Sequence, residues 1–301
     1  MLDGLSSGEI ELVGRKVRLT HTDRIYFPEA GITKGHIIRY YLDISPLLLP
    51  HLRDRPLNLE RFPEGVGAES FYQKNASAFF PSWLRTFSVD YPRAHKTNRH
   101  VLVDDAAGLI YLANLGTITF HAFLSRIDDL THPDLLILDV DPPDLAGLTR
   151  EESFKPVVET AFLLREELLA LGMAPRVKTT GKRGLHLGVS LDRRSTYNEV
   201  RTALTELFTR LSERRPDLMS RAVRKEKRRH RVYLDALRMA MGATVAPPYT
   251  VRATAVASIS MPVTWEELAT LEHSQVYTVA NALARVTSVG DLWAPLVTPG
   301  A

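Results

Sequence analysis

The sequence of 301 residues contains no cysteine. Disulfides, thiolate metal sites and a cysteine nucleophile are therefore excluded, and any bound metal must be held by oxygen or imidazole ligands. No apolar run reaches the roughly 18 residues that a membrane-spanning helix needs. The N-terminal stretch MLDGLSSGEIELVG also lacks the basic and then apolar pattern of a secretion signal. These absences predict a cytoplasmic protein with no membrane partner.

The composition that remains is ordinary for a globular protein, with 45% hydrophobic and 24% charged residues and a formal net charge of +3. The basic residues are unevenly placed, because seven of the eleven residues from 221 to 231 are lysine or arginine. Such a run is either a solvated surface or a contact for a phosphate backbone. The basic run is therefore compatible with a polyanionic partner but does not require one.

Short alternating segments and capped helical segments predict an α+β fold with mixed or antiparallel central sheets flanked by helices. Three capping boxes mark helix starts, at Thr149 with Glu152, Thr196 with Glu199 and Thr264 with Glu267. Residues 90–100, DYPRAHKTNRH, are polar and show no period, so we expect an exposed loop there.

The stretch DLLILDVDPPD, residues 134–144, combines a buried strand with two carboxylates at its end. Asp139 and Asp141 are two residues apart and therefore point to the same face of the strand. Asp235 also ends an apolar strand and could complete a carboxylate cluster that suits Mg²⁺ or Mn²⁺. A solvated acidic turn, with Asp235 capping or pairing an arginine, is the simpler alternative.

The segment TTGKRGLHL, residues 179–187, places two glycines in a turn between two strands. Its backbone N–H groups, with Thr180, Lys182, Arg183 and His186, could cradle a triphosphate. A hairpin turn with a surface histidine explains the same pattern.

Several further residues could reach the same site. His121 would face the carboxylates if its strand pairs with the strand of Asp139, and Arg238 and Arg252 could reach phosphates there. Phe71 and Tyr72 could stack on an unpaired base. Adjacent strand residues point to opposite faces, so we expect one of these two rings to lie in the core.

The ordered segments LDVDPP, TTGKRGLHL, VYLDALR and PPYTVRA resemble the polymerase domain of bacterial ATP-dependent DNA ligase D. That family belongs to the archaeo-eukaryotic primase superfamily, so the resemblance implies a primase-like α+β fold. It also implies one primase-polymerase domain over residues 1–301. Within it we expect a DNA-end-binding part (1–130), a catalytic core (131–270) and a C-terminal helix and tail (271–301).

The resemblance assigns roles to individual residues. Asp139, Asp141 and Asp235 would be the catalytic ligands of two Mn²⁺ or Mg²⁺ ions. The residues implied to bind the nucleotide are His121, Thr180, His186, Arg238, Thr244 and Arg252. Those implied to bind DNA, including the 5′-phosphate of the downstream strand, are Arg24, Lys34, Phe71, Tyr72, Lys225 and Arg228.

The implied function is template-dependent addition of nucleotides to DNA 3′ ends at double-strand breaks in non-homologous end joining. Partners would be gapped DNA with a 5′-phosphate, nucleoside triphosphates with ribonucleotides preferred, Ku and an ATP-dependent ligase, in the bacterial cytoplasm at the nucleoid. Met239 and Met241 stand where polar residues are common in the family. They leave open a weakly catalytic module that binds and joins DNA ends, and a metal-dependent phosphohydrolase or nuclease is the other alternative.

Overall fold

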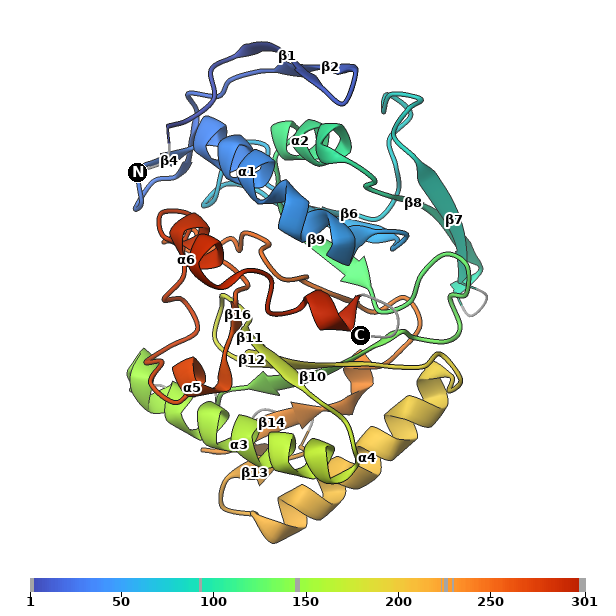
Figure 1. The fold of residues 1–301 in the computed structure, drawn as a ribbon, viewed down its shortest axis with the longest axis vertical. Coiled ribbons are helices and arrows are strands. Elements are labelled where there is room, and N and C mark those ends of the chain that lie inside the picture. Colours follow the sequence, from blue (N-terminus) through green and yellow to red (C-terminus); the bar gives the residue numbers. More distant parts are fainter. Residues whose placement is uncertain are drawn as a thin grey trace. The chain divides into compact units, whose positions relative to one another are not determined.

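The computed structural model describes residues 3–91, 94–143, 147–222, 224, 227–228 and 230–297. The chain divides into two compact units. Unit 1 comprises Met1–Asp128, Thr244–Ser260 and Tyr277–Gly290. Unit 2 comprises Asp129–Ala243, Met261–Val276 and Asp291–Ala301. Each unit has its own six-stranded sheet and helices, which confirms the α+β class (Figure 1). None of the helices in the described ranges has the length and apolar character to cross a membrane.

Unit 1 begins with a hairpin and ends with a helix contributed by the C-terminal part of the chain. Its elements are β1 (Gly8–Leu12), β2 (Arg15–Leu19), β3 (Ile25–Phe27), β4 (Ile32–Thr33), α1 (Lys34–Leu52), β5 (Leu57–Arg61), β6 (Phe71–Gln73), β7 (Thr86–Tyr91), β8 (Lys96–Val101), α2 (Ala106–Asn114), β9 (Thr117–Phe123), β15 (Thr244–Val245) and α6 (Ala282–Val289).

The main sheet of unit 1 has the order β15-β9-β5-β8-β7, and β6 pairs with β5 at its side. Helix α1 starts at a capping box in which the Thr33 hydroxyl accepts the His36 N–H and the His36 ring accepts the Thr33 N–H. Helix α1 packs against α2, and α2 contacts β9. The buried aromatic side chains Tyr40, Tyr41 and Phe120 lie in this core.

Unit 2 carries the strands that end in aspartates. Its elements are β10 (Leu135–Asp141), α3 (Arg150–Ala170), β11 (Arg176–Thr179), β12 (Leu185–Ser190), α4 (Tyr197–Arg214), β13 (Met219–Ser220), β14 (Val232–Asp235), the 3₁₀ turn η3 (Ala236–Arg238), β16 (Pro262–Val263), α5 (Trp265–Leu268) and the 3₁₀ turn η4 (Ala294–Leu296).

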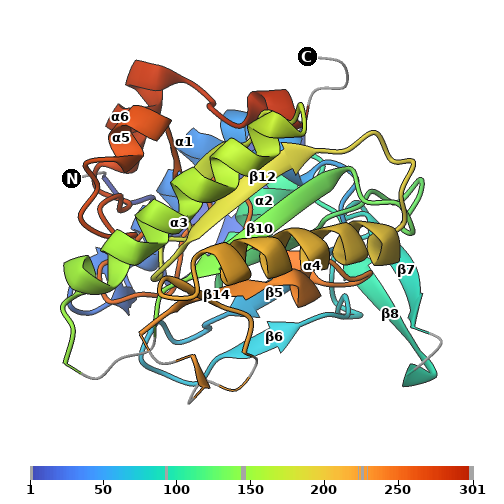
Figure 2. The ribbon, with the colours of Figure 1, turned by 90° about the horizontal axis from the view of Figure 1, so that it is seen from below.

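The sheet of unit 2 has the order β13-β14-β10-β12-β11-β16, and all its pairs are antiparallel except β13 with β14. Seen from below, α3 and α4 lie in front of β10, β12 and β14 (Figure 2). The capping boxes at Thr149, Thr196 and Thr264 start α3, α4 and α5 as predicted. Each buried leucine or phenylalanine of such a helix contributes about 1.5–3 kcal/mol to folding, and α3 contacts β10 and β12.

The loop predicted over residues 90–100 is wrong over most of its length. β7 pairs with β8 in an antiparallel ladder that runs from Thr86 with Val101 to Tyr91 with Lys96. The inward positions of β8 are polar, and this hides the alternation in the sequence. Asn98 and His100 are buried there and hydrogen-bond to Asn75 and to the carbonyl of Leu57.

Candidate active site

Four polar side chains form a row across the central strands of the unit 2 sheet. Asp235 on β14 is the cross-strand partner of Asp139 on β10. Asp139 is opposite His186 on β12, and His186 is opposite Lys178 on β11. Directly opposed residues of antiparallel strands carry their side chains on the same face. Two carboxylates, an imidazole and an ammonium group therefore lie in line on one face of the sheet.

Asp139 is the most buried carboxylate of this row, with only 4% of the residue exposed. His186 Nε2 lies 3.4 Å from its Oδ1, and Arg238 Nε donates to its Oδ2 at 3.0 Å. Burial alone would raise the pKa of Asp139, but the hydrogen bond from His186 and the charge of Arg238 outweigh it and hold this pKa below its ordinary value. Asp139 is thus kept ionised inside the protein.

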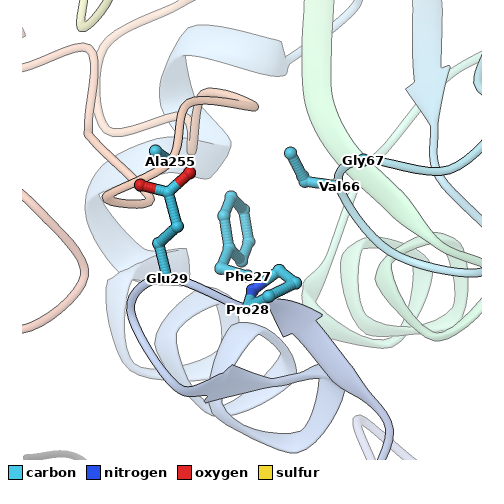
Figure 3. Close-up of a pocket in the computed structure, with 6 residues that line it drawn as sticks. All are labelled: Phe27, Pro28, Glu29, Val66, Gly67 and Ala255. Carbon is cyan, nitrogen blue, oxygen red and sulfur yellow. The ribbon is translucent and has the colours of Figure 1, made fainter.

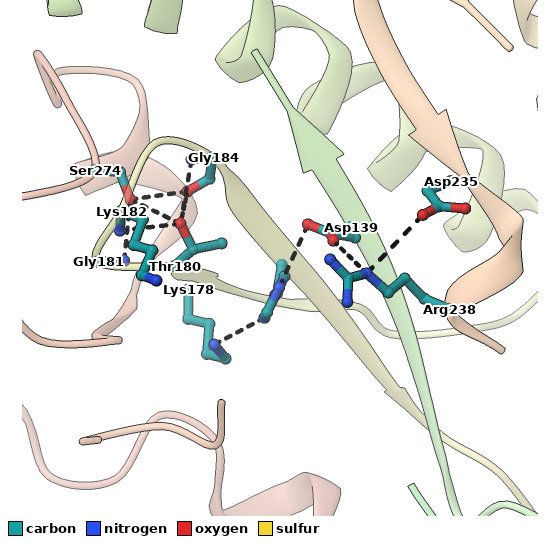
Figure 4. A network of polar contacts seen from close by, with 10 residues as sticks. Asp139, Lys178, Thr180, Gly181, Lys182, Gly184, Asp235, Arg238 and Ser274 are labelled. Carbon is teal, nitrogen blue, oxygen red and sulfur yellow. Dashed lines mark hydrogen bonds and ion pairs between the residues drawn. The ribbon is translucent and has the colours of Figure 1, made fainter. Parts of the chain in front are cut away.

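Arg238 reaches Asp139 because the chain turns back directly after β14. The carboxylate of Asp235 accepts the N–H of Leu237 at 2.8 Å and so caps the short 3₁₀ turn that ends at Arg238. Arg238 Nε then lies 3.9 Å from an oxygen of Asp235. Figure 4 shows the guanidinium group directed at both carboxylates. Arg238 is therefore the positive charge that balances the pair.

The residue types at this point fit a divalent cation. Asp141 lies two residues beyond Asp139 on β10 and so on the same face. Burial raises the pKa of Asp141 to about 6, and the charge of Asp139 adds to this rise. Carboxylates that oppose each other's ionisation favour a cation, and oxygen ligands of this kind suit Mg²⁺ or Mn²⁺.

The side chains are nevertheless not arranged as a metal centre. Within the described ranges, no group of three or more histidine and acidic side chains is placed to hold a metal ion. Arg238 donates to Asp139 at 3.0 Å and lies 3.9 Å from Asp235, so it would compete with a cation held by these two carboxylates. Asp139, Asp141 and Asp235 as the ligands of two ions therefore stay a prediction.

Replacing Arg238 with glutamine tests this competition. Without metal, we expect the free energy of unfolding to fall by about 1–2 kcal/mol, because Asp139 loses a cationic partner. Loss of one partner of a fully buried pair costs about 3–5 kcal/mol, but 48% of the Arg238 side chain is exposed and solvent screens the pair. Mn²⁺ should raise the melting temperature more in the variant than in the unchanged protein.

The matched control is Arg214→Gln, which removes an exposed ion pair with Glu167 on the helical side of unit 2. Thermal unfolding with a chelator and with Mn²⁺ should give nearly the same metal-induced shift in this control as in the unchanged protein. An equal shift in Arg238→Gln as well would show that the arginine does not compete with the ion.

The turn between β11 and β12 is shaped by the hydroxyl group of Thr180. This oxygen accepts the N–H groups of Lys182 and Gly184, both at 3.2 Å. The hydroxyl group of Ser274 accepts the N–H of Gly181 at 3.1 Å and donates to the carbonyl of Gly184 at 2.9 Å (Figure 4). These N–H groups of Gly181, Lys182 and Gly184 thus bond to the hydroxyls of Ser274 and Thr180. Phosphate binding by Thr180 stays a prediction.

Two buried residues of this region were missed by the sequence reasoning. Lys178 is fully buried, its Nζ lies 2.9 Å from Nδ1 of His186, and the ammonium group sits over the ring of Trp293 at 5.4 Å. A lysine in a buried strand, two residues before Thr180, was the available signal. Ser274 lies far along the chain from the turn that it supports, and nothing in its surroundings in the sequence marks it.

The other predicted nucleotide contacts belong to unit 1. The pairing of β9 with β10 that would bring His121 to the carboxylates does not occur, since β9 pairs with β5 and β15. His121 Nε2 lies 3.4 Å from a carboxylate oxygen of Glu60. Asn58 donates to the hydroxyl of Thr244 at 3.4 Å, and Arg252 is buried. Nucleotide binding by His121, Thr244 and Arg252 stays a prediction.

The two predicted 5′-phosphate ligands lie close together in unit 1. The N–H of Lys34 donates to the carbonyl of Arg24 at 2.8 Å, and the Lys34 ammonium group donates to the carbonyl of Thr20 at 2.5 Å. Burial and, to a smaller extent, the nearby charge of Arg24 together lower the pKa of Lys34 to about 8. Arg24 also donates to Glu64 at 2.6 Å. Two cations that oppose each other favour an anion between them.

Phe71 and Tyr72 are both exposed, 45% and 54% respectively. The expectation that one of these rings lies in the core is therefore wrong. β6 is a three-residue strand that pairs only with β5, at the side of the sheet, so both positions stay partly exposed. The ring of Tyr72 lies 5.5 Å from that of His121, and the guanidinium of Arg61 lies 5.2 Å from the ring of Phe71.

The basic run is only partly described, and Lys225 lies outside the described residues. Arg228 lies over the ring of Tyr233 at 3.5 Å and donates to the carbonyl of Ala222. Its role as a DNA contact stays a prediction. Met239 is fully buried, so it packs in the interior where the family commonly has a polar residue, whereas Met241 is 37% exposed.

A small pocket of about 240 Å³ opens beside the hairpin of β3 and β4 in unit 1. Figure 3 shows the ring of Phe27 and the carboxylate of Glu29 directed into the space that Val66 closes from the other side. The remaining lining residues are Pro28, Gly67 and Ala255. A pocket whose one charged group is a carboxylate does not suit a phosphate, so it adds nothing to the predicted nucleotide or DNA contacts.

Comparison with known proteins places these features in a family. A family model described as the LigD primase-polymerase domain matches residues 33–293. The multifunctional non-homologous end joining protein LigD of Mycolicibacterium smegmatis is 28% identical over 283 residues, 93% of this chain and 36% of that protein. The bifunctional non-homologous end joining protein LigD of Bacillus subtilis is 28% identical over 277 residues, 91% of this chain and 43% of that protein. The chain thus spans less than half the length of these relatives.

A solved structure agrees with the sequence comparison. The polymerase domain from Mycobacterium tuberculosis ligase D, in complex with DNA, matches with a TM-score of 0.86 and 25% identity. The match covers 95% of this chain and 99% of that chain. Since the family model extends over most of the sequence and the fold agrees over nearly all of it, the chain belongs to the LigD primase-polymerase domain family, a family of nucleotidyltransferases.

Proposed function

We propose that this chain is a template-dependent nucleotidyltransferase that extends a DNA 3′ end, filling short gaps at double-strand breaks during non-homologous end joining. The observation that supports it best is the row from Asp235 through Asp139 and His186 to Lys178, beside the turn at Thr180. The row has carboxylates at one end and basic side chains at the other. This arrangement suits phosphoryl transfer, which needs mainly positioning of the reactants and neutralisation of their charge. Family membership supplies the reaction class.

The carboxylates would face the reacting groups. Asp139, Asp141 and Asp235 would hold two Mg²⁺ or Mn²⁺ ions, which when bound lower the pKa of the primer 3′-hydroxyl and neutralise charge on the departing pyrophosphate. Arg238 ends the short turn that Asp235 caps. From there its side chain would turn away from Asp139 and contact the triphosphate. Its positive charge would then pair with the triphosphate instead of with Asp139.

The contacts of His186 indicate which donor it would offer to a substrate. A lysine ammonium group has only donors, so Lys178 donates to Nδ1 of His186 at 2.9 Å. The ring proton is then on Nε2, which faces the Oδ1 of Asp139 at 3.4 Å. Nε2 would therefore present an N–H donor toward the carboxylates, where we place the triphosphate. The hydroxyl of Thr180 lies on the adjoining turn and donates to the carbonyl of Gly184 at 3.1 Å. It would add a second donor to the triphosphate by turning away from that carbonyl.

The substrates follow from the same residues and from the family. We propose a gapped DNA end whose downstream 5′-phosphate is held by Arg24 and Lys34, with Phe71 and Tyr72 stacked where the template turns. We propose nucleoside triphosphates, ribonucleotides preferred, as the second substrate, and Ku and an ATP-dependent ligase as partners on cytoplasmic DNA. We also retain residues 1–301 as one primase-polymerase domain.

Primer extension tests the proposal directly. The protein is incubated with a labelled primer on a template with a short 5′-phosphorylated gap, with ribo- or deoxyribonucleoside triphosphates and either Mg²⁺ or Mn²⁺. We expect templated products longer than the primer, and more of them with ribonucleotides. Shortened DNA would favour a nuclease, and unchanged primer with retained binding of DNA would favour a weakly catalytic module that joins ends.

A further inference from the structure

A connected stretch of unit 1 carries packed aromatic rings with a guanidinium group at each end. The stretch begins at the exposed ring of Phe71 and continues onto helix α2 and the segment before β7. We name it the aromatic band and define it by its seven residues, Phe71, Arg61, Tyr111, Phe80, Phe79, Trp83 and Arg15.

Tyr111 on α2 is the centre of the band. Its ring lies 5.8 Å from that of Phe80 at an interplanar angle of 90°, and 5.6 Å from that of Trp83 at 74°. Phe79 continues the contact with Phe80 at 5.2 Å and 85°. Edge-to-face packing of this kind fixes the rings and leaves their outer faces available to a further planar group.

A guanidinium group lies at each end of these rings. Arg15 lies over the ring of Trp83 at 5.0 Å, and Arg61 lies over the ring of Phe71 at 5.2 Å. Arg61 also donates to the carbonyl of Leu115 at the end of α2, through Nε at 3.1 Å and Nη2 at 2.6 Å. These bonds tie β5 to the helix that carries Tyr111 and join the two halves of the band.

The aromatic band leaves apolar side chains exposed on the surface instead of burying them in the core. The ring of Phe79 is 65% exposed and that of Phe71 is 45% exposed, while Phe80, Trp83 and Tyr111 are partly exposed. Connected exposed rings of this kind mark a binding surface. Nucleobases stack on aromatic rings and on guanidinium planes alike. Arg61 at one end adds positive charge that attracts phosphates, and Arg15 at the other end is paired with Asp105. A surface for a protein partner would not need planar cations at both ends of its rings.

We propose that the aromatic band binds an unpaired nucleic-acid strand, with Phe79 stacking on a base. The proposal that the band binds single-stranded nucleic acid is argued from the geometry of the band and does not depend on the proposed function. Its use for the unpaired template beyond the gap rests on the proposed function, because that function supplies the template. Phe79 would then lie one or more nucleotides farther along the strand than the stacking position at Phe71.

Substitution of Phe79 tests the inference in the full chain. Phe79→Ser should raise the dissociation constant for a fluorescein-labelled oligothymidylate about 5- to 10-fold in anisotropy titrations, since loss of one base stack weakens binding by that order. Phe79→Trp should keep the dissociation constant of the unchanged protein. The fluorescence of the added indole should be quenched when the unlabelled oligonucleotide binds. Leu171→Ser removes an apolar side chain of similar exposure, 58%, from unit 2 and should leave the constant unchanged.

Two results would overturn the inference. One is an unchanged dissociation constant in Phe79→Ser, with folding verified by thermal unfolding. The other is an equal loss for blunt duplex DNA, which has no unpaired bases to stack. Weaker binding of single strands by Phe79→Ser supports the band even if the unchanged protein extends no primer, so failure of the proposed function and failure of this inference are separable.

Discussion

Replacing Asp139 with asparagine is expected to reduce primer extension roughly 10³-fold or more, while binding of gapped DNA changes little. Asparagine keeps the shape of the side chain, and its carbonyl still accepts from Arg238. It removes the charge that a divalent cation needs, and that charge supports several kcal/mol of transition-state stabilisation, at about 1.36 kcal/mol for each factor of ten in rate. Single-turnover extension with Mn²⁺ measures the effect on the chemical step.

Asp217→Asn is the matched control for this change. Asp217 lies in unit 2 and is paired with Arg215, but its side chain is 66% exposed. The control should extend primers at the rate of the unchanged protein. Extension by Asp139→Asn at more than about a tenth of that rate would contradict the assignment of Asp139 as a metal ligand, and weakened DNA binding would place it in the DNA contact instead.

The carboxylate positions of unit 2 could be predicted because local rules determine them. A continuous apolar strand followed by two prolines places Asp139 and Asp141 at a strand end, and period-two alternation puts them on one face. The register that sets Asp235 opposite Asp139 is a long-range property. The sequence indicated only that Asp235 ends an apolar strand, and the resemblance to the family joined it to the other two.

The features that sequence missed depend on tertiary pairing. Lys178 gains its role from lying opposite His186, and no local pattern reveals that register. β8 was mistaken for a loop because its inward side chains are hydrogen-bonded polar groups, which break the apolar alternation. The interpretation that puts His121 beside the carboxylates requires β9 to pair with β10, as strands close in sequence commonly do, but these two strands belong to different sheets.

Recognition of the 5′-phosphate by Lys34 should depend on pH, because burial lowers the pKa of this lysine. Its pKa is lowered from 10.5 to about 8, so the free folded protein disfavours the charged form. The unfolded chain binds more protons between these two values, and therefore this group makes the free protein more stable as the pH rises from about 8 to 10.5. A bound phosphate would act in the opposite direction, because it favours the ammonium form.

Preference for a 5′-phosphorylated gap should therefore be lost as the pH rises above about 8. At pH 7 we expect the phosphorylated gap to bind about tenfold more tightly than the hydroxylated one, as one charge-assisted contact provides. Lys34→Gln should bring this ratio near unity at every pH, since its side chain has no charge to lose. Lys16→Gln, which removes an exposed lysine paired with Glu9, should keep both the ratio and its pH dependence. A ratio in the unchanged protein that stays constant from pH 7 to about 9.5, well above the pKa of Lys34, would show that the 5′-phosphate is recognised by other groups.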